Sequence, residues 1–271
     1  MEVTQISKEE FELFKKYIYD NTGIRLADHK ATLLKTRLNK RLRELNLNSF
    51  KEYYEYLGNN QQEYTKFVNA ISTNVTSFFR EARQWEFLSK EIENIKARAI
   101  GKKLRIWSAA CSTGEEPYTI AMFLKKEIEE FNNYDIKILA SDISHDALTK
   151  AKRGIYKGKD VGDLPKHHIS NNFIKVGKTD EYRIDDELSD LVMFREFNLV
   201  YGDYSLFGKT QFDLIFCRNV MIYFDNDTKK AIVQNLAKKL KKGGYLFIGH
   251  SESLMAHEGL KYVVPSIYKK I

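Results

Sequence analysis

Two adjacent acidic residues follow a turn of small residues and could bind a positively charged ligand. Glu115 and Glu116 come directly after Ser112-Thr113-Gly114, and Pro117 suits the first turn of a helix. A helix start normally attracts phosphate, but two carboxylates would repel it and would favour an amine or a sulfonium. The Gly-x-Gly-x-x-Gly dinucleotide fingerprint is also missing. The turn therefore indicates S-adenosylmethionine rather than a dinucleotide, the alternative being two acids that only stabilise a helix start.

Further polar side chains follow predicted strands and would share an edge with this turn. They are Asp142, Asn198, Arg218 and Asn219. Ligands of open parallel sheets bind outside the carboxyl ends of the strands, so these side chains outline one cleft. Asp142 could accept both hydroxyls of a ribose there. Capping of the helix that begins near Ser144 would explain Asp142 almost equally well.

Strands alternate with helices after residue 103, which predicts an α/β domain over residues 101–271. Such alternation is typical of a parallel sheet with helices on both faces. The predicted strands occupy 104–111, 136–140, 212–217 and 245–249, and the predicted helices 115–130, 144–153 and 227–241. This alternation of strands and helices is interrupted at about 156–197. We predict a β-rich insertion there, with short strands at 172–176 and 191–197.

The first 72 residues lack strand-like alternation and predict a small all-helical domain, followed by a connecting helix and loop over 73–100. Ser7 with Glu10 and Ser49 with Glu52 fit the capping-box spacing that begins a helix. Between them one helix has a core face of leucines at helical spacing, namely Leu34, Leu38, Leu42 and Leu45. Cationic side chains occupy other directions around the same helix, namely Arg37, Lys40, Arg41 and Arg43.

Composition limits the class of protein. An apolar content of 43% with 13% aromatic residues is enough for a packed core. The longest stretch without charged residues, 67–79, is shorter than the roughly 18 residues of a membrane span, and the acidic start is unlike a secretory signal. We therefore expect a cytoplasmic protein, with Cys111 and Cys217 as reduced core thiols. The net charge of +7 fits an acidic partner without identifying it.

Two other kinds of site are not supported. The six histidines are scattered and no metal-ligand spacing emerges, so we predict no metal. His250, Ser251 and Glu252 could suggest a hydrolase triad, but Ser251 lacks the flanking glycines of a nucleophile elbow.

Five ordered motifs resemble one family, the bacterial chemotaxis receptor methyltransferases or CheR family. They are residues 74–81 (NVTSFFRE), 112–118 (STGEEPY), 140–143 (ASDI), 216–224 (FCRNVMIYF) and 249–253 (GHSES). The resemblance implies a Rossmann-like methyltransferase that transfers a methyl group from S-adenosylmethionine to glutamate side chains of chemoreceptor cytoplasmic helices. The products would be glutamyl methyl esters and S-adenosylhomocysteine. No membrane insertion and no nucleic-acid partner are implied.

The same resemblance implies roles for individual residues. Those near the cofactor would be Asn74, Thr76, Arg80, Glu115, Asp142, Asn198, Leu199, Arg218 and Asn219. Arg80, Arg218 and Tyr223 would lie near the transferred methyl group, and either Arg218 or Tyr223 could orient the incoming carboxylate. We favour Tyr223, because an arginine that holds a carboxylate tightly would lower its nucleophilicity. For the rings of Phe78 and Phe79 we favour simple core packing.

Several alternatives remain open. The basic helix could meet acidic receptor helices, but it could equally be a solvated surface or contact nucleic acid. The chain could instead methylate RNA or DNA bases, although its three isolated prolines do not form the Asn/Asp-Pro-Pro-aromatic loop common in base-amino methylation. It could also be a non-catalytic adaptor that binds S-adenosylmethionine. The insertion could hold a receptor's C-terminal peptide by strand addition, or simply contain ordinary turns.

Overall fold

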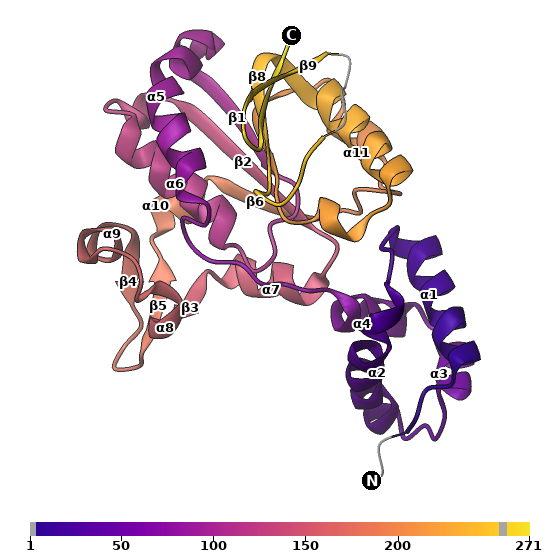
Figure 1. Ribbon diagram of the computed structural model, residues 1–271. Coiled ribbons are helices and arrows are strands. Elements are labelled where there is room, and N and C mark those ends of the chain that lie inside the picture. The colour runs from indigo at the N-terminus through magenta and orange to yellow at the C-terminus, as the bar shows by residue number, and fades with distance from the viewer. Residues whose placement is uncertain (1–3, 255–258) are drawn as a thin grey trace.

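The computed structural model describes residues 4–254 and 259–271, and it consists of a helical bundle joined to an α/β domain (Figure 1). Residues 1–3 of the predicted helical domain and 255–258 of the predicted α/β domain lie outside the described residues. The bundle contains α1 (Lys8–Thr22), α2 (Ala31–Leu45), α3 (Phe50–Gly58) and α4 (Gln61–Ile71). No helix among the described residues has the length and apolar character required to cross a bilayer.

A seven-stranded sheet is the centre of the α/β domain, in the order β6-β2-β1-β7-β8-β10-β9. Its strands are β1 (Lys103–Ser108), β2 (Asp135–Asp142), β6 (Val192–Glu196), β7 (Phe212–Cys217), β8 (Leu240–Ile248), β9 (Leu260–Val264) and β10 (Ile267–Lys270). The five strands from β6 to β8 are parallel, whereas β10 pairs antiparallel with both β8 and β9. The chain passes from β1 to β2 on one side and reaches β7 on the other, so strand order reverses beside β1.

Helices cover both faces of this sheet, as the sequence predicted (Figure 1). One face packs against α5 (Ala82–Arg98) and α6 (Glu115–Glu127), and the other packs against α11 (Asn226–Lys239). α7 (His145–Arg153) follows β2. The central strands β1, β2, β7 and β8 are largely buried because they lie between the two helical layers, and β7 is buried at every position.

The insertion is smaller than the predicted 156–197, and it mixes helices with strands. A separate three-stranded sheet has the order β3-β5-β4, formed by β3 (Ile155–Lys157), β4 (Phe173–Lys175) and β5 (Glu181–Ile184). Short helices α8 (Gly158–Val161), α9 (Lys166–Asn172) and α10 (Asp186–Ser189) accompany it. The predicted strand at 191–197 corresponds to β6, which pairs with β2 in the main sheet. Local alternation indicates that a strand forms but contains no information about its partner.

The helical bundle has a core of its own. Leu34, Leu38 and Leu42 are buried as their spacing predicted, and they pack with aromatic residues of α1, α3 and α4. The capping box at Ser7 and Glu10 is confirmed, with both reciprocal hydrogen bonds present. At Ser49 only half of the box forms: its hydroxyl accepts from the Glu52 amide, but the Glu52 carboxylate accepts from the amide of Asn48.

Hydrogen bonds join the bundle to the carboxyl edge of the main sheet. The Asn69 side chain of α4 accepts from the Ser144 hydroxyl and the Asp146 amide at the start of α7. The carbonyl of Asn21 accepts from the Asn198 side chain, and the Arg25 amide donates to the carbonyl of Tyr223. The helical bundle therefore closes one side of the sheet edge where parallel sheets bind their ligands.

Candidate active site

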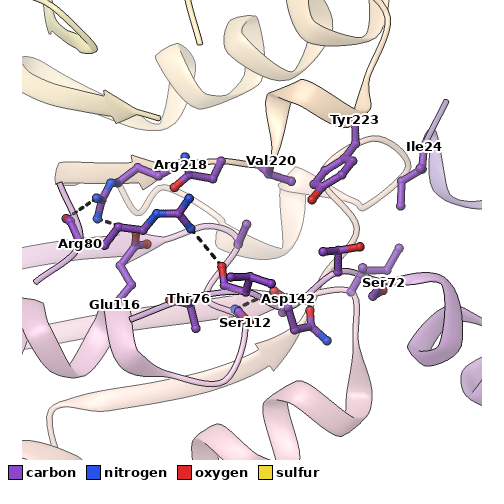
Figure 2. Close-up of a pocket in the computed structure, with 16 residues that line it drawn as sticks. Ile24, Ser72, Thr76, Arg80, Ser112, Glu116, Asp142, Arg218, Val220 and Tyr223 are labelled. Carbon is purple, nitrogen blue, oxygen red and sulfur yellow. Dashed lines mark hydrogen bonds and ion pairs between the residues drawn. The ribbon is translucent and has the colours of Figure 1, made fainter. Parts of the chain in front are cut away.

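A pocket opens at the carboxyl end of β1, where strand order reverses (Figure 2). Its walls come from the helical bundle, the segment that connects the two domains, and the loops after β1, β2 and β7. The lining residues are Ile24, Ser72, Thr73, Asn74, Val75, Thr76, Arg80, Ala110, Ser112, Glu116, Asp142, Ile143, Arg218, Asn219, Val220 and Tyr223. Seven of the residues implied by the family resemblance are thus brought together: Asn74, Thr76, Arg80, Asp142, Arg218, Asn219 and Tyr223.

The loop after β1 is held by Asp142 at the end of β2. One carboxylate oxygen of Asp142 accepts from the Ser112 amide at 2.8 Å, and the other accepts from the Ser144 amide at 2.9 Å. Burial raises the pKa of Asp142, although these amides oppose the shift. The cap of α7 is Ser144, whose hydroxyl accepts from Ala147, so Asp142 does not itself cap this helix. Its carboxylate fixes the loop and also lines the pocket.

Of the two adjacent acids, only Glu116 lines the pocket. Its carboxylate accepts from the Ser108 hydroxyl at 2.7 Å and lies 3.1 Å from the Arg218 guanidinium. Glu115 is 5% exposed and accepts instead from the Thr113 hydroxyl. Consecutive residues of a helix point about 100° apart, so one helix start cannot direct both side chains into the same pocket. The structure does not bring Glu115 to the pocket lining.

Arg218 is buried within a network of protein groups. Its guanidinium pairs with Glu116 and with Glu81 of the connecting segment, and donates to the carbonyl of Arg80 at 2.5 Å. The Arg218 side chain is only 3% exposed, and it lies over the ring of Trp85. Such a paired guanidinium has little capacity left for a substrate carboxylate. This geometry supports a structural role for Arg218 and strengthens the preference for Tyr223.

Glu81 supports two pocket-lining residues, Arg218 and Asn219, and no role for it was expected from the sequence. It has a positive φ of 63°, and its carboxylate accepts from the Asn219 side chain and the His250 amide. Burial alone would raise the pKa of Glu81, but the His250 amide, Arg218 and Asn219 outweigh burial and hold the pKa below its usual value. Its position at the end of the 74–81 motif was the signal that could have identified it.

Glu252 supports the loop that contains Tyr223. Its carboxylate accepts from the backbone amides of Gly249, Asn219 and Ile222. Burial raises the pKa of Glu252, and these amides oppose the shift. The carboxylate therefore joins the loop after β7 to the loop after β8, a role unrelated to the hydrolase triad that we rejected on sequence.

Tyr223 and Arg80 occupy different parts of the pocket wall. Figure 2 shows the Tyr223 ring across from Asp142, whereas Arg80, Arg218 and Glu116 lie together at the other end. Among the described residues, the Tyr223 hydroxyl has no hydrogen-bond partner. Arg80 donates to the carbonyl of Val75 and has other N–H groups available. These two side chains are the polar groups best placed to contact a ligand.

An adjoining apolar pocket extends the site toward the bundle. Its lining includes Phe197, Asn198 and Leu199, and it shares Asp142 and Tyr223 with the first pocket. The Asn198 side chain donates to the carbonyl of Asn21 and accepts from the amides of Val200 and Tyr201. Its polar atoms therefore hold the loop, while Leu199 supplies apolar surface suited to a flat ring.

Two of the four predicted docking cations are engaged inside the protein. Arg41 is 8% exposed, and its guanidinium pairs with Glu63 inside the bundle. Arg37 donates to the carbonyls of Ile71 and Ser72, and anchors the end of α4. The Lys40 side chain remains 74% exposed, and Arg43 is also exposed. Helical spacing could have indicated the burial of Arg41, because Arg41 follows Leu34 by seven residues and therefore lies about 20° from it around the helix, on the leucine face.

The residues of the pocket fit S-adenosylmethionine. The Ser112 hydroxyl is buried beside Asp142 and has no hydrogen-bond partner among the described residues, so a ligand hydroxyl or amine could satisfy it. Asp142 can accept from ribose hydroxyls, Arg80 can bind a carboxylate, and Leu199 offers apolar surface. A parallel sheet with this donor and acceptor set at its switch point defines a class of α/β enzymes that bind an adenosine-containing cofactor.

Comparison with known proteins identifies the family within this class. Residues 74–269 match the family model described as CheR methyltransferase, SAM binding domain, and residues 9–72 match CheR methyltransferase, all-alpha domain. A chemotaxis protein methyltransferase of Borreliella burgdorferi is 39% identical, over 98% of this chain and 95% of the relative. One from Escherichia coli is 40% identical over 92% and 85%. The chain belongs to the CheR methyltransferase family.

Membership of this family settles the kind of chemistry. The protein is an S-adenosylmethionine-dependent methyltransferase of chemotaxis, as the sequence motifs predicted. A further relative, chemotaxis protein methyltransferase 2 of Pseudomonas aeruginosa, is 40% identical over 92% of this chain and 88% of its own length. The alternatives of a nucleic-acid methyltransferase and of a non-catalytic adaptor are not favoured by these matches.

Proposed function

We propose that this protein methylates glutamate side chains on cytoplasmic helices of chemoreceptors, and that it acts in the cytoplasm. The supporting observation is a pocket lined by a carboxylate, Asp142, and by the Tyr223 hydroxyl, which has no hydrogen-bond partner in the described part of the chain. The curated relatives of this chain are chemotaxis protein methyltransferases. When bound, S-adenosylmethionine supplies a methyl group on a positively charged sulfur. Asp142, Ser112 and Arg80 hold it, with Leu199 against the apolar part.

The site needs no general base for this reaction. A glutamate carboxylate has a usual pKa of about 4.3 and is already ionised at neutral pH, so it is a competent nucleophile. The task of the protein is to align this carboxylate and to exclude water. Alignment alone can supply on the order of 7–11 kcal/mol of the barrier. In this proposal the Tyr223 hydroxyl donates one hydrogen bond to the incoming carboxylate. The remaining lone pairs of the carboxylate stay available to attack the methyl group.

The exposed cations of α2 are a second part of the proposal. Lys40 and Arg43 would meet acidic receptor helices and would mainly increase the association rate and orient the complex. Arg37 and Arg41 would contribute only by keeping α2 in place. The proposal thus divides the four cations into two that contact the receptor and two that support them.

Transfer of isotope-labelled methyl groups tests the reaction. We expect label from S-adenosylmethionine to enter a purified chemoreceptor cytoplasmic fragment and to leave as methanol on mild base treatment, which is diagnostic of an ester. A receptor fragment with its glutamates replaced by alanine is the control. Label that survives base, or that moves into added nucleic acid, would refute glutamate methylation.

Calorimetry tests the pocket separately. We expect S-adenosylhomocysteine to bind to the wild-type protein and to bind at least about tenfold more weakly to Asp142→Asn, because a charge-assisted ribose contact is lost. Exposed Asp180, in the turn between β4 and β5, provides the control substitution Asp180→Asn. Equal affinity in the two variants would contradict the assignment of Asp142, and binding of ATP or NADH in place of S-adenosylhomocysteine would contradict the cofactor site.

A further inference from the structure

A buried tyrosine of the small sheet contacts the pocket loop from behind. Tyr156 lies in β3 and is fully buried, and its hydroxyl donates to the carbonyl of Thr113 at 2.8 Å. Thr113 belongs to the loop between β1 and α6. The preceding residue of this loop, Ser112, lines the pocket. Burial raises the pKa of Tyr156 well above its usual value, so the hydroxyl remains a donor at neutral pH.

The carbonyl of Thr113 lies outside the hydrogen-bond ladder of α6. The N-cap of this helix is Gly114, and its carbonyl accepts the first intrahelical bond, from the Tyr118 amide at 3.2 Å. Thr113 precedes the cap, so its carbonyl has no partner within the helix. The Tyr156 hydroxyl is the donor that pairs this carbonyl.

The loop itself has a backbone that needs support. Ser112 has a φ of 49° and Gly114 a φ of 98°, and both values lie in the left-handed region. A Cβ atom at Gly114 would lie only 2.8 Å from the Tyr156 hydroxyl oxygen, so the loop is packed directly against the tyrosine. Glycine adopts such a φ freely, so the energetic cost falls on Ser112, and neighbouring groups must offset it.

Tyr156 also supports the opposite wall of the pocket. Its ring packs edge-on against Phe78, with 4.9 Å between the ring centroids. Phe78 lies in the connecting segment that supplies Asn74, Thr76 and Arg80 to the pocket lining. One side chain of the small sheet thus contacts both the loop after β1 and the segment that faces this loop across the site.

We propose that Tyr156 is a positioning residue, through which the small sheet holds the two walls of the cofactor pocket at the separation needed for binding. This inference rests on the proposal that the pocket binds S-adenosylmethionine. It assigns the insertion a role in cofactor affinity, because the sheet that fixes Tyr156 through the pairing of β3 with β5 also fixes the pocket loop.

The protein contains a matched control for this contact. Tyr118 of α6 is equally buried, its hydroxyl also donates to a backbone carbonyl at 2.8 Å, and its ring lies 6.3 Å from that of Tyr156. Its acceptor is Ala151 of α7, which does not line the pocket. Tyr118→Phe and Tyr156→Phe therefore remove the same chemical group from the same core but differ in their effect on the loop.

Calorimetry with S-adenosylhomocysteine compares the two variants. We expect Tyr156→Phe to raise the dissociation constant about threefold to tenfold and Tyr118→Phe to change it less than about twofold, with similar losses of thermal stability. In steady-state assays the KM for S-adenosylmethionine should rise in Tyr156→Phe while kcat changes little, as expected when binding rather than the chemical step is affected. Equal affinities in the two variants would overturn the inference.

Hydrogen exchange provides a measurement on the unmodified chain. Under low urea, the amides of Ser112 and Gly114 should open with the same free energy as those of β3 if the small sheet holds the loop. Loop amides that open independently of β3 would also overturn the proposal. If the wild-type protein failed to bind S-adenosylhomocysteine at all, the assignment of the pocket would fail, whereas normal binding in Tyr156→Phe would refute only the role of Tyr156.

Discussion

The guanidinium of Arg218 lies 3.1 Å from the carboxylate of Glu116, and both side chains are largely buried in the wall of the pocket. The family resemblance places this arginine near the transferred methyl group, but its guanidinium already forms ion pairs within the protein. Its second partner, Glu81, comes from a segment far away in the sequence. This network joins the connecting segment, the start of α6 and the loop after β7.

Removal of Arg218 should therefore reduce stability as well as activity. In Arg218→Met two buried carboxylates lose their cation, and we expect the free energy of unfolding to fall by about 3–5 kcal/mol. Urea denaturation measures this change, and Arg43→Met, at an exposed position, should cost about 0.5 kcal/mol or less. A fully stable Arg218→Met protein without methyl transfer would instead support direct contact with the substrate.

Tyr223→Phe should separate catalysis from cofactor binding. The variant keeps the ring that lines the pocket and loses only the hydroxyl, so we expect kcat to fall about tenfold or more and the affinity for S-adenosylhomocysteine to change less than about twofold. Tyr262→Phe, on exposed β9, is the control for loss of a hydroxyl. Equal losses in kcat and in affinity would assign Tyr223 to the cofactor alone.

The two supporting carboxylates should give stability opposite dependences on pH. The folded state lowers the pKa of Glu81 below its usual value of 4.5, so its stabilisation is complete above pH 4.5 and is lost as the pH falls through the folded pKa. The folded state raises the pKa of Glu252 above 4.5, so its contribution is complete below pH 4.5 and is lost as the pH rises through the folded pKa.

Free energies of unfolding measured from pH 3.5 to 7 in the wild type, Glu81→Gln and Glu252→Gln test these signs. Relative to Glu81→Gln, the wild type should gain stability as pH rises toward about 4.5. Relative to Glu252→Gln, it should lose stability as pH rises above that value. Parallel curves for all three proteins would show that neither carboxylate has a shifted pKa.

Charge reversal on α2 should act on receptor association. We expect Lys40→Glu with Arg43→Glu to slow receptor methylation at low salt, and the difference to shrink as salt screens the exposed charges. The control, Lys242→Glu with Lys261→Glu, makes the same change in net charge on exposed residues of β8 and β9. Figure 1 shows these strands at the end of the α/β domain away from α2. Similar effects from both pairs would indicate a general effect of net charge rather than docking by α2.

The local features of this protein could be predicted from its sequence. The leucine spacing of α2, the alternation of strands and helices, and the polar residues that end successive strands are consequences of 3.6-residue and two-residue periodicities, and these require no knowledge of the fold. Since the carboxyl ends of parallel strands meet at one edge, the order of residues along the chain was enough to predict that Asp142, Arg218 and Asn219 share one cleft. Tyr223 was implied only by the family resemblance.

Only the tertiary structure decided which partner each side chain meets. Glu115 and Glu116 are neighbours in sequence, yet only Glu116 lines the pocket; Arg41 and Lys40 are also neighbours, yet one is buried against Glu63 and the other is exposed. The same is true of β6, whose pattern shows a strand but not its pairing with β2. Burial and pairing depend on residues distant in the chain, and they are fixed only when helices and sheets pack together.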